Sequence, residues 1–300
     1  MTILNHRFLQ NGNVFTAYYD EGRGAPMVLV HGFMGSKVDF HDQIEPLTAH
    51  CRVLAYDQRG HGESSNLAQP ECYSFETLQQ DLLGFLDAMA IDTCHLVGHS
   101  MGGMVAMRFA LNYPERVNSL VLMSTSPDPV EVVPEPVRRL FCRKVRKHGC
   151  SVMLKTICAH PLASVKHSEE GEKEKQLDRL AAKYEQMDPE AFVALSAELT
   201  RHTSVLEQLK DITCPTTILF GEKDDVFHPP AIAMADVIPQ ATLVEVPDAA
   251  HSPHYENRRH WQENIVAHLE RAALSGIRSY GSPHNSAQQF LRTAPHSLEN

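Results

Sequence analysis

Ser100 is the residue whose setting most clearly predicts chemistry, because it is the centre of a G-x-S-x-G element at residues 98–102. An apolar run precedes this element and a helix-like segment, residues 103–110, follows it. A sharp strand-to-helix turn forces its central residue into a strained, exposed position, and flanking glycines avoid the clashes that a Cβ would cause. Backbone N–H groups at the helix start can then stabilise an oxyanion. We therefore expect Ser100 to be a nucleophile rather than an incidental serine in a glycine-rich turn.

A serine hydroxyl reacts at neutral pH only when a base and an orienting acid activate it. The chain has 18 histidines, so position must select the base. A strand-like run at 214–221 ends directly before a Glu-Lys-Asp-Asp segment, and another at 241–246 ends shortly before His251. Because both segments follow strand ends, we expect a carboxylate and His251 at the same sheet edge as Ser100. Ligands of such sheets bind at the carboxyl ends of the strands.

From about residue 12 to about residue 272 the chain resembles the α/β-hydrolase superfamily, in which the nucleophile, acid and base follow one another in this order. Residues 31–35 (His-Gly-Phe-Met-Gly) are similar to the family's oxyanion loop, and residues 57–64 are similar to the loop after its fourth strand. Residues 98–103 match the nucleophile elbow, and residues 221–224 and 251–253 match the acid and base loops.

The resemblance implies a role for each matching residue. Ser100 is the nucleophile, Asp224 the orienting acid and His251 the base, and the backbone N–H groups of Phe33 and Met101 form the oxyanion hole. It also implies the α/β-hydrolase fold, a mostly parallel central sheet with helices on both faces and an inserted helical cap. No cofactor and no metal ion is expected.

Two of these role assignments, those of the acid and of the base, have an alternative. Asp225 could replace Asp224 if the acid turn were shifted by one residue, although the family spacing of glycine, two residues and aspartate favours Asp224. His254 lies close enough in sequence to compete with His251, which follows Ala250 where the family usually has glycine.

Further polar residues in these motifs are expected to support loops rather than to react. His99 adjoins the nucleophile but should point away from it across the sharp turn. His31 and His61 are interpreted as loop-packing residues, and Asp57 and Arg59 as residues that tie loops together.

Apolar runs and helical spacings alternate along the core sequence. Near-continuous apolar strands are expected when helices cover both faces of a parallel sheet. We expect an opening hairpin region at 13–19, strands at 27–30, 52–56 and 117–123, and helices at 40–50, 75–89 and 230–237.

Residues 128–211 interrupt this alternation with helical segments at 137–148, 152–159, 172–187 and 189–201. We interpret them as a cap over a core formed by residues 1–127 and 212–274, with residues 275–300 as a flexible polar tail that has room for a short helix at 287–291. A cap excludes water and shapes a pocket. Its candidate pocket residues, which could equally pack the cap on the core, are Phe141, Met153, Leu154, Ile157 and Leu162.

A basic cluster runs through the first cap helix. Its members are Arg138, Arg139, Arg143, Lys144, Arg146 and Lys147. Such a cluster is typical of a solvated helix face, and the alternative is a cap surface that contacts an anion.

The amino-acid composition limits the kinds of partner and the compartment that we expect for this protein. The formal net charge of −10 argues against nucleic acid and anionic membranes and leaves a small-molecule substrate. Seven cysteines without paired spacing indicate reduced thiols in a cytoplasmic protein. The amino-terminal residues show no signal-peptide pattern, and no apolar stretch is long enough to span a membrane.

Three functions fit these features. The first is hydrolysis of a small carboxylic ester, lactone or thioester through an acyl-serine intermediate. The second is carbon–carbon bond hydrolysis of the meta-cleavage type, although relatives with that activity usually have a more glycine-rich oxyanion loop than residues 31–35. The third is a non-catalytic receptor or scaffold that keeps the triad. Dehalogenation and epoxide opening are disfavoured, because such relatives have aspartate at the position of Ser100.

Overall fold

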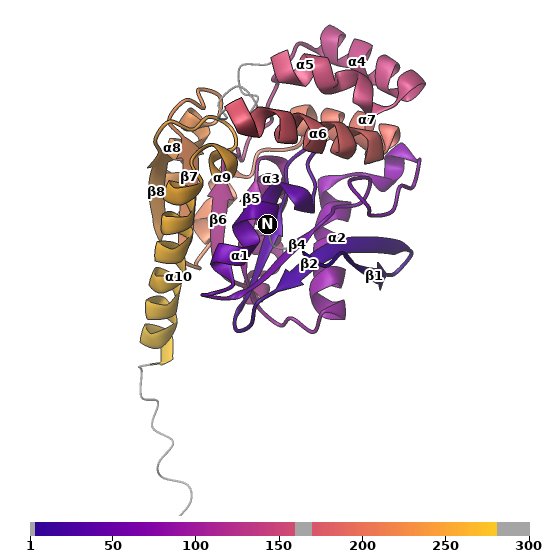
Figure 1. Cartoon of the computed structure of the whole chain (residues 1–300). Helices are drawn as coiled ribbons and strands as arrows, with labels where there is room; N and C mark the ends of the chain where they lie inside the picture. Colours follow the sequence, from indigo (N-terminus) through magenta and orange to yellow (C-terminus); the bar gives the residue numbers. More distant parts are fainter. Residues whose placement is uncertain (1–3, 160–169, 281–300) are drawn as a thin grey trace, which may run out of the picture.

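The computed structural model describes residues 4–159 and 170–280. Its centre is an eight-stranded sheet with the strand order β1-β2-β4-β3-β5-β6-β7-β8 (Figure 1). β1 pairs antiparallel with β2 and β2 antiparallel with β4, whereas all later pairs are parallel. The strands are β1 (Arg7–Asn11), β2 (Val14–Glu21), β3 (Pro26–Val30), β4 (Arg52–Tyr56), β5 (Cys94–His99), β6 (Val117–Met123), β7 (Thr216–Gly221) and β8 (Ala241–Val246).

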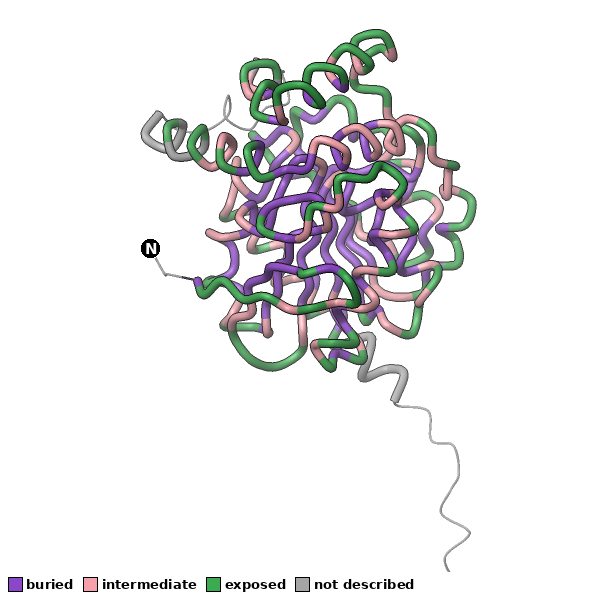
Figure 2. The backbone as a smooth tube through the Cα atoms, turned by 90° about the vertical axis from the view of Figure 1, so that its right-hand side faces the viewer, coloured by how far each residue is buried: buried purple, intermediate pink, exposed green. Residues whose placement is uncertain are grey.

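Helices cover both faces of the sheet, which explains the near-continuous apolar strands. In β3, Val28 and Val30 face one apolar cluster and Met27 and Leu29 face the other, because successive side chains alternate across a strand. The buried strands lie at the centre of the molecule (Figure 2). The first cluster is closed by α2 (Phe75–Ala88), α3 (Met101–Asn112) and α8 (His228–Val237), the second by α1 (His41–Leu47) and α10 (Arg258–Tyr280).

The structure confirms the predicted α/β-hydrolase fold and corrects some boundaries. The predicted helix at 40–50 is a 3-10 turn (η1, Lys37–Phe40) followed by the shorter α1. α10 continues to Tyr280, so residues 275–280, which we placed in a flexible tail, are helical. Residues 281–300, with the predicted short helix at 287–291, lie outside the described residues.

A helical region is inserted between β6 and β7, and lies over the end of the sheet where β5 runs into α3 (Figure 1). Its chain leaves and re-enters the core at one place, because the Val205 N–H donates to the Pro127 carbonyl (3.1 Å) and the Val130 N–H to the Leu199 carbonyl (2.8 Å). The elements are α4 (Glu135–His148), η4 (Cys150–Met153), α5 (Leu154–Ala159), α6 (Glu170–Gln186) and α7 (Pro189–Arg201), followed by η6 (Leu206–Asp211).

Ion pairs and an apolar cluster fix this cap region to the core. Lys183 of α6 donates to Asp39, and Arg179 Nη1 lies 2.8 Å from Asp42 Oδ2. Before α7, the Asp188 carboxylate accepts a hydrogen bond from the Tyr73 hydroxyl at 2.5 Å. Apolar side chains of α4, α6 and α7 pack against Met101, Met104 and other residues around the nucleophile turn. The cap is therefore held on both sides of the sheet edge.

All seven cysteines are free thiols. Among the described residues, no helix combines the length and the apolar character that crossing a membrane requires.

Candidate active site

Ser100 occupies a strained turn between β5 and α3. Its φ of 53° and ψ of −119° lie in a region that side-chain-bearing residues rarely adopt, at a cost of about 1–3 kcal/mol. Two hydrogen bonds hold the turn: the Ser100 N–H donates to the Met123 carbonyl (2.9 Å), and the Thr125 hydroxyl donates to the Ser100 carbonyl (2.7 Å). The strained strand-to-helix turn predicted at Ser100 is therefore present, and Ser100 itself is partly exposed.

The glycines on either side of Ser100 are required by close backbone approach. A Cβ on Gly98 would lie 2.5 Å from the Gly102 carbonyl oxygen, and a Cβ on Gly102 would overlap the Val30 carbonyl. The clash predicted for larger residues at these positions is therefore real.

The structure brings Ser100, His251 and Asp224 together. Ser100 Oγ lies 3.1 Å from His251 Nε2, and His251 Nδ1 lies 3.1 Å from Asp224 Oδ2. Asp224 is fully buried in the turn after β7, where its N–H donates to the Gly221 carbonyl (2.9 Å). The neighbouring Asp225 is exposed, so the geometry supports Asp224 as the acid.

His251 is fixed by residues that the sequence motifs did not identify. His99 donates from Nε2 to the His251 carbonyl (2.8 Å), across 152 residues of sequence. The Phe227 ring stacks on the imidazole with centroids 4.8 Å apart, and the Glu256 carboxylate accepts from the N–H of Ala250. His99 was expected only to point away from Ser100, and no local signal indicated its contact with His251.

His254 lies behind the site rather than in it. It is fully buried, and its ring packs on His99 (4.9 Å between centroids) and on Phe40 (5.2 Å). Neither ring nitrogen has a hydrogen-bond partner among the described residues. Burial, as the largest cause, holds the pKa of His254 well below its usual value. The geometry therefore favours His251 over His254 as the base.

The loop at 31–35 lies against Ser100, as an oxyanion loop must. A Cβ on Gly32 would lie 3.1 Å from Ser100 Cβ. Within the described part of the chain, the backbone N–H groups of Phe33 and Met101 donate to no other residue. Both predicted donors are therefore free to bind an oxyanion.

Buried polar residues hold the loop at 31–35 in place. The Gln58 N–H donates to His31 Nε2 (3.0 Å), and the Gln58 side-chain amide donates to the His31 carbonyl (2.8 Å). Burial is the main cause that lowers the pKa of His31 to about 4, so the ring is neutral at pH 7. Lys37 donates to Asp57 at 2.7 Å, and the His61 ring packs against His31, in line with the supporting roles expected of these residues.

Arg59 has the loop-tying contact that its position indicated. Its guanidinium donates to the Asp81 carboxylate of α2 and, through Nη1, to the Cys72 carbonyl at 3.0 Å. The loop after β4 is thereby joined to the helix that covers it.

A cavity of about 290 Å³ lies between this constellation and the cap. From the core it is lined by Phe33, Met34, Ser100, Met104, Phe227 and His251. The cap contributes mostly apolar side chains, including the predicted Phe141 and Met153. It also contributes Phe192, Tyr184 and Arg138, which were not predicted as pocket residues. Leu154 is half-buried and does not line the cavity, whereas the Ile157 side chain and Leu162 lie outside what the structure describes.

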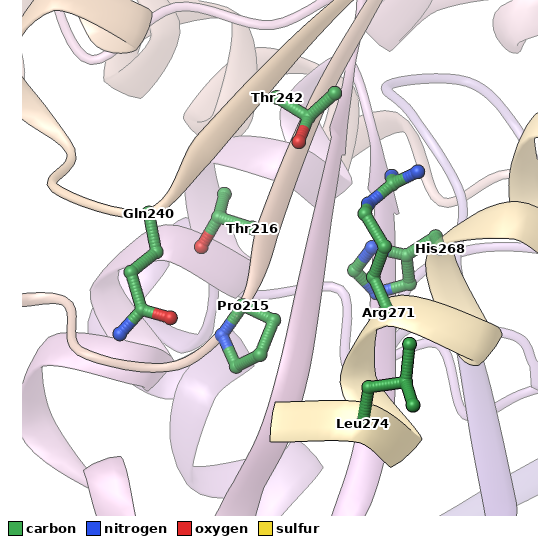
Figure 3. A pocket seen from close by; sticks show the side chains of 7 residues that line it. All are labelled: Pro215, Thr216, Gln240, Thr242, His268, Arg271 and Leu274. Atoms are coloured by element: carbon green, nitrogen blue, oxygen red, sulfur yellow. The ribbon is translucent and has the colours of Figure 1, made fainter. Parts of the chain in front are cut away.

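A second cavity, of about 260 Å³, lies at the opposite edge of the sheet (Figure 3). α10 contributes His268, Arg271 and Leu274 to its wall. β7, β8 and the residues before them contribute Pro215, Thr216, Gln240 and Thr242. No carboxylate lines this cavity, so it lacks the acid that a triad needs. No group of three metal-ligating side chains that could hold an ion occurs among the described residues.

Comparison with known proteins agrees with this architecture. A family model described as alpha/beta hydrolase fold matches residues 25–258. A thermophilic esterase from Thermogutta terrifontis superposes with a TM-score of 0.77 at 26% identity, covering 89% of this chain and 99% of that one.

Two curated relatives extend the comparison. The dihydrolipoyllysine-residue acetyltransferase component of an acetoin cleaving system from Pseudomonas putida is 30% identical over 83% of this chain and 64% of its own length. An sn-1-specific diacylglycerol lipase from Mus musculus is 28% identical over 81% of this chain and 80% of its own length. In three of the curated relatives, the part that this chain matches covers only 35%, 64% and 35% of the relative's own length.

Proposed function

Because the chain belongs to the α/β-hydrolase fold family, we propose that it is a serine hydrolase that cleaves a small carboxylic ester, lactone or thioester through an acyl-serine intermediate. One observation carries this proposal: the Ser100–His251–Asp224 chain of 3.1 Å contacts opens onto an apolar cavity. The likeness to an esterase and a lipase supports the same reaction class. Seven free thiols fit the cytoplasmic location that we include in the proposal.

In the proposed mechanism the buried Asp224 carboxylate accepts a hydrogen bond from the His251 Nδ1–H, which leaves the lone pair of Nε2 facing Ser100. Ser100 Oγ attacks the substrate carbonyl while its proton passes to Nε2. The carbonyl π electrons move to oxygen, and the N–H groups of Phe33 and Met101 stabilise the resulting negative charge. The imidazolium then donates its proton to the leaving alcohol or thiol as the carbon–heteroatom bond breaks.

Water completes the cycle by the same steps. His251 takes a proton from a water molecule, whose oxygen attacks the acyl-serine carbonyl, and the second tetrahedral species expels Ser100 Oγ. The Ser100 oxygen recovers its proton from His251, and a carboxylic acid leaves. The cap limits the access of bulk water to this chemistry and sets the size of the substrate.

The proposal is tested by a fluorophosphonate probe together with an activity panel of p-nitrophenyl esters, lactones and acyl thioesters. We expect the probe to label the wild type at Ser100, and both labelling and hydrolysis to disappear in Ser100→Ala. Labelling that persists undiminished in Ser100→Ala would overturn the assignment.

The same experiment, with a vinylogous diketone added to the panel, separates the two other functions. A wild type that is neither labelled nor active on any member supports a receptor or scaffold. Labelling of Ser100 combined with turnover of a vinylogous diketone alone supports carbon–carbon bond hydrolysis.

A further inference from the structure

Arg138 is the one side chain of permanent charge among the described residues that line the cavity over Ser100. It comes from α4, and only 11% of its side chain is exposed. Two other basic residues of this helix behave differently: the side chain of Arg139 is 68% exposed and that of Arg146 is 49% exposed. The basic cluster seen in the sequence is therefore divided, with most of it in solvent and Arg138 facing the cavity.

The guanidinium of Arg138 has no close anionic partner in the described part of the chain. Its recorded ion pair is to Glu135 Oε1 at 3.8 Å, which is too long for a hydrogen bond. That same carboxylate oxygen lies 2.9 Å from Arg139 Nη2 and 2.9 Å from Arg201 Nη2. The hydrogen bond and charge of Arg139, the largest causes, hold the pKa of Glu135 below its usual value, so the carboxylate is ionised and already shared.

No acidic side chain among the described lining residues complements this charge. The Ser196 hydroxyl donates to the Val193 carbonyl (2.9 Å) and the Thr200 hydroxyl to the Ala197 carbonyl (3.0 Å). None of the lining residues is Asp or Glu. A guanidinium in such surroundings loses hydration and gains only one distant, shared carboxylate, so an anionic ligand would improve the balance.

The single positive charge of Arg138 indicates which type of anion the cavity would bind. A planar guanidinium matches a carboxylate with two parallel N–H···O contacts. A phosphate with nearly two charges would leave one of them uncompensated beside a single arginine. The cavity, of about 290 Å³, is also at the small end of the range for ligand pockets.

Building on the proposed function, we propose that the substrate is a carboxylate-bearing ester, lactone or thioester whose carboxylate binds Arg138 while its reacting carbonyl lies at Ser100. Arg138 is then a specificity-determining residue. It contacts a part of the substrate that does not react, and its contribution appears mainly in KM.

The test uses a chain-length series of p-nitrophenyl hydrogen adipate, pimelate and suberate. Each is compared with its neutral isostere, in which an isopropyl group replaces the carboxylate. For at least one length we expect wild-type kcat/KM to be about 10-fold higher for the acid, equivalent to one good charge-assisted contact. Arg138→Met should remove this preference through KM and leave hydrolysis of the isostere nearly unchanged. Arg138→Lys should keep part of it.

Arg139→Met is the matched control. Arg139 is on the same helix and bonds the same Glu135, but does not line the cavity, so its loss should leave the acid-to-isostere ratio unchanged. The inference is overturned if wild type shows no preference for the acid at any length, if Arg138→Met keeps that preference, or if both methionine variants change the ratio equally. Because each variant is measured on both esters, a general loss of stability cancels in the ratio.

A separate readout distinguishes this inference from the proposed function. If no ester is hydrolysed and Ser100 is not labelled, the proposed function fails. The anion site is then tested by the thermal shift that monoethyl adipate produces. A shift in wild type that is absent in Arg138→Met supports the site, and no shift in wild type overturns it.

Discussion

Among the described residues, Ser100 and Ser119 each contact histidine, at opposite edges of the same sheet, and only Ser100 has the arrangement of a nucleophile and its base. At the carboxyl edge, Ser100 contacts His251 Nε2, and His251 Nδ1 contacts Asp224. At the amino edge, Ser119 Oγ lies 2.7 Å from His268 Nε2, and His268 Nδ1 lies 2.7 Å from the Thr217 hydroxyl. Distance and residue type therefore do not by themselves make a serine reactive.

The third member decides the direction of the hydrogen bonds. An ionised carboxylate can only accept, so Asp224 accepts a hydrogen bond from the Nδ1–H of His251 and leaves Nε2 unprotonated as a base. At the amino edge, Arg271 donates to the Thr217 hydroxyl (2.8 Å), which favours the Thr217 proton pointing to His268 Nδ1. His268 then carries its proton on Nε2 and donates it to Ser119, whose own proton reaches His95 Nδ1 at 2.7 Å.

The two serines also differ in their backbone position. Ser119 is fully buried within β6, where its N–H and carbonyl belong to the sheet. Ser100 occupies a left-handed turn at the start of a helix, beside two free N–H groups and below a cavity. We infer that one cluster serves catalysis and the other serves stability.

The largest predicted effect is on turnover. Ser100→Ala should lower kcat/KM for the best ester by on the order of 10⁵-fold, because the covalent step is lost. Ser119→Ala should leave kcat/KM little changed and lower the free energy of unfolding by about 1–3 kcal/mol, because the buried His268 and the partly buried His95 both lose a partner. Steady-state kinetics and urea denaturation of both variants measure this contrast. Equal losses of activity would show that the amino-edge cluster takes part in catalysis.

The next effect tests the acid. Asp224→Asn should lower kcat by on the order of 10⁴-fold, because an amide can donate to His251 Nδ1 and so stabilise the wrong tautomer. Asp225→Asn changes the same functional group in an exposed neighbour and should leave kcat little changed. The reverse ranking would assign the acid to Asp225 and keep the rest of the mechanism. Either pre-steady-state or steady-state rates, measured on one activated ester, are enough to rank the two variants.

Sequence reasoning was sufficient to place the short segments at strand ends that carry the candidate site residues. Ser100 was predictable because its glycines are fixed by local backbone crowding, and the loops of Asp224 and His251 follow apolar strands. The sheet was predictable for the same reason, since strands buried on both faces leave a clear apolar pattern.

The remainder depends on tertiary packing. His99 supports His251 across 152 residues, a contact with no local signature. Arg138 belongs to a basic run, and only the packing of α4 on α7 decides which of its members faces the cavity. α10 extends through residues 275–280 although their composition indicated a tail, because the helix is already established by its buried half around Trp261 and Ile265.

A smaller predicted effect is on the pH dependence of the free energy of unfolding. Burial, with a smaller contribution from the Arg271 charge, lowers the pKa of His268 to about 3. The unfolded chain binds a proton there below about pH 6.5 while the folded chain does not. The contribution of His268 to stability is therefore complete above pH 6.5 and is lost, by about 1.4 kcal/mol per pH unit, as the pH falls toward 3.

Urea denaturation between pH 7.5 and pH 4.5 measures this slope. His268→Gln should reduce the pH dependence of the free energy of unfolding by one proton, whereas His148→Gln, at an exposed position, should not change it. A His268→Gln slope equal to that of the wild type would mean that the ring binds its proton equally in the folded and unfolded chain, which contradicts a lowered pKa.

The smallest predicted effect on the free energy of unfolding comes from a comparison of two buried histidines, His254 and His268. Both ring nitrogens of His268 have hydroxyl partners, whereas neither nitrogen of His254 has one among the described residues. His254→Phe removes two buried polar atoms that make no hydrogen bond and keeps a ring against His99, so it should raise the free energy of unfolding by about 1 kcal/mol. His268→Phe should lower it by about 1–3 kcal/mol, because Ser119 and Thr217 lose their partner. Destabilisation by both substitutions would show that packing volume, not hydrogen bonding, governs these sites. Esterase activity measured on His254→Phe completes the comparison, since a variant that keeps full turnover leaves His251 as the base of the proposed triad.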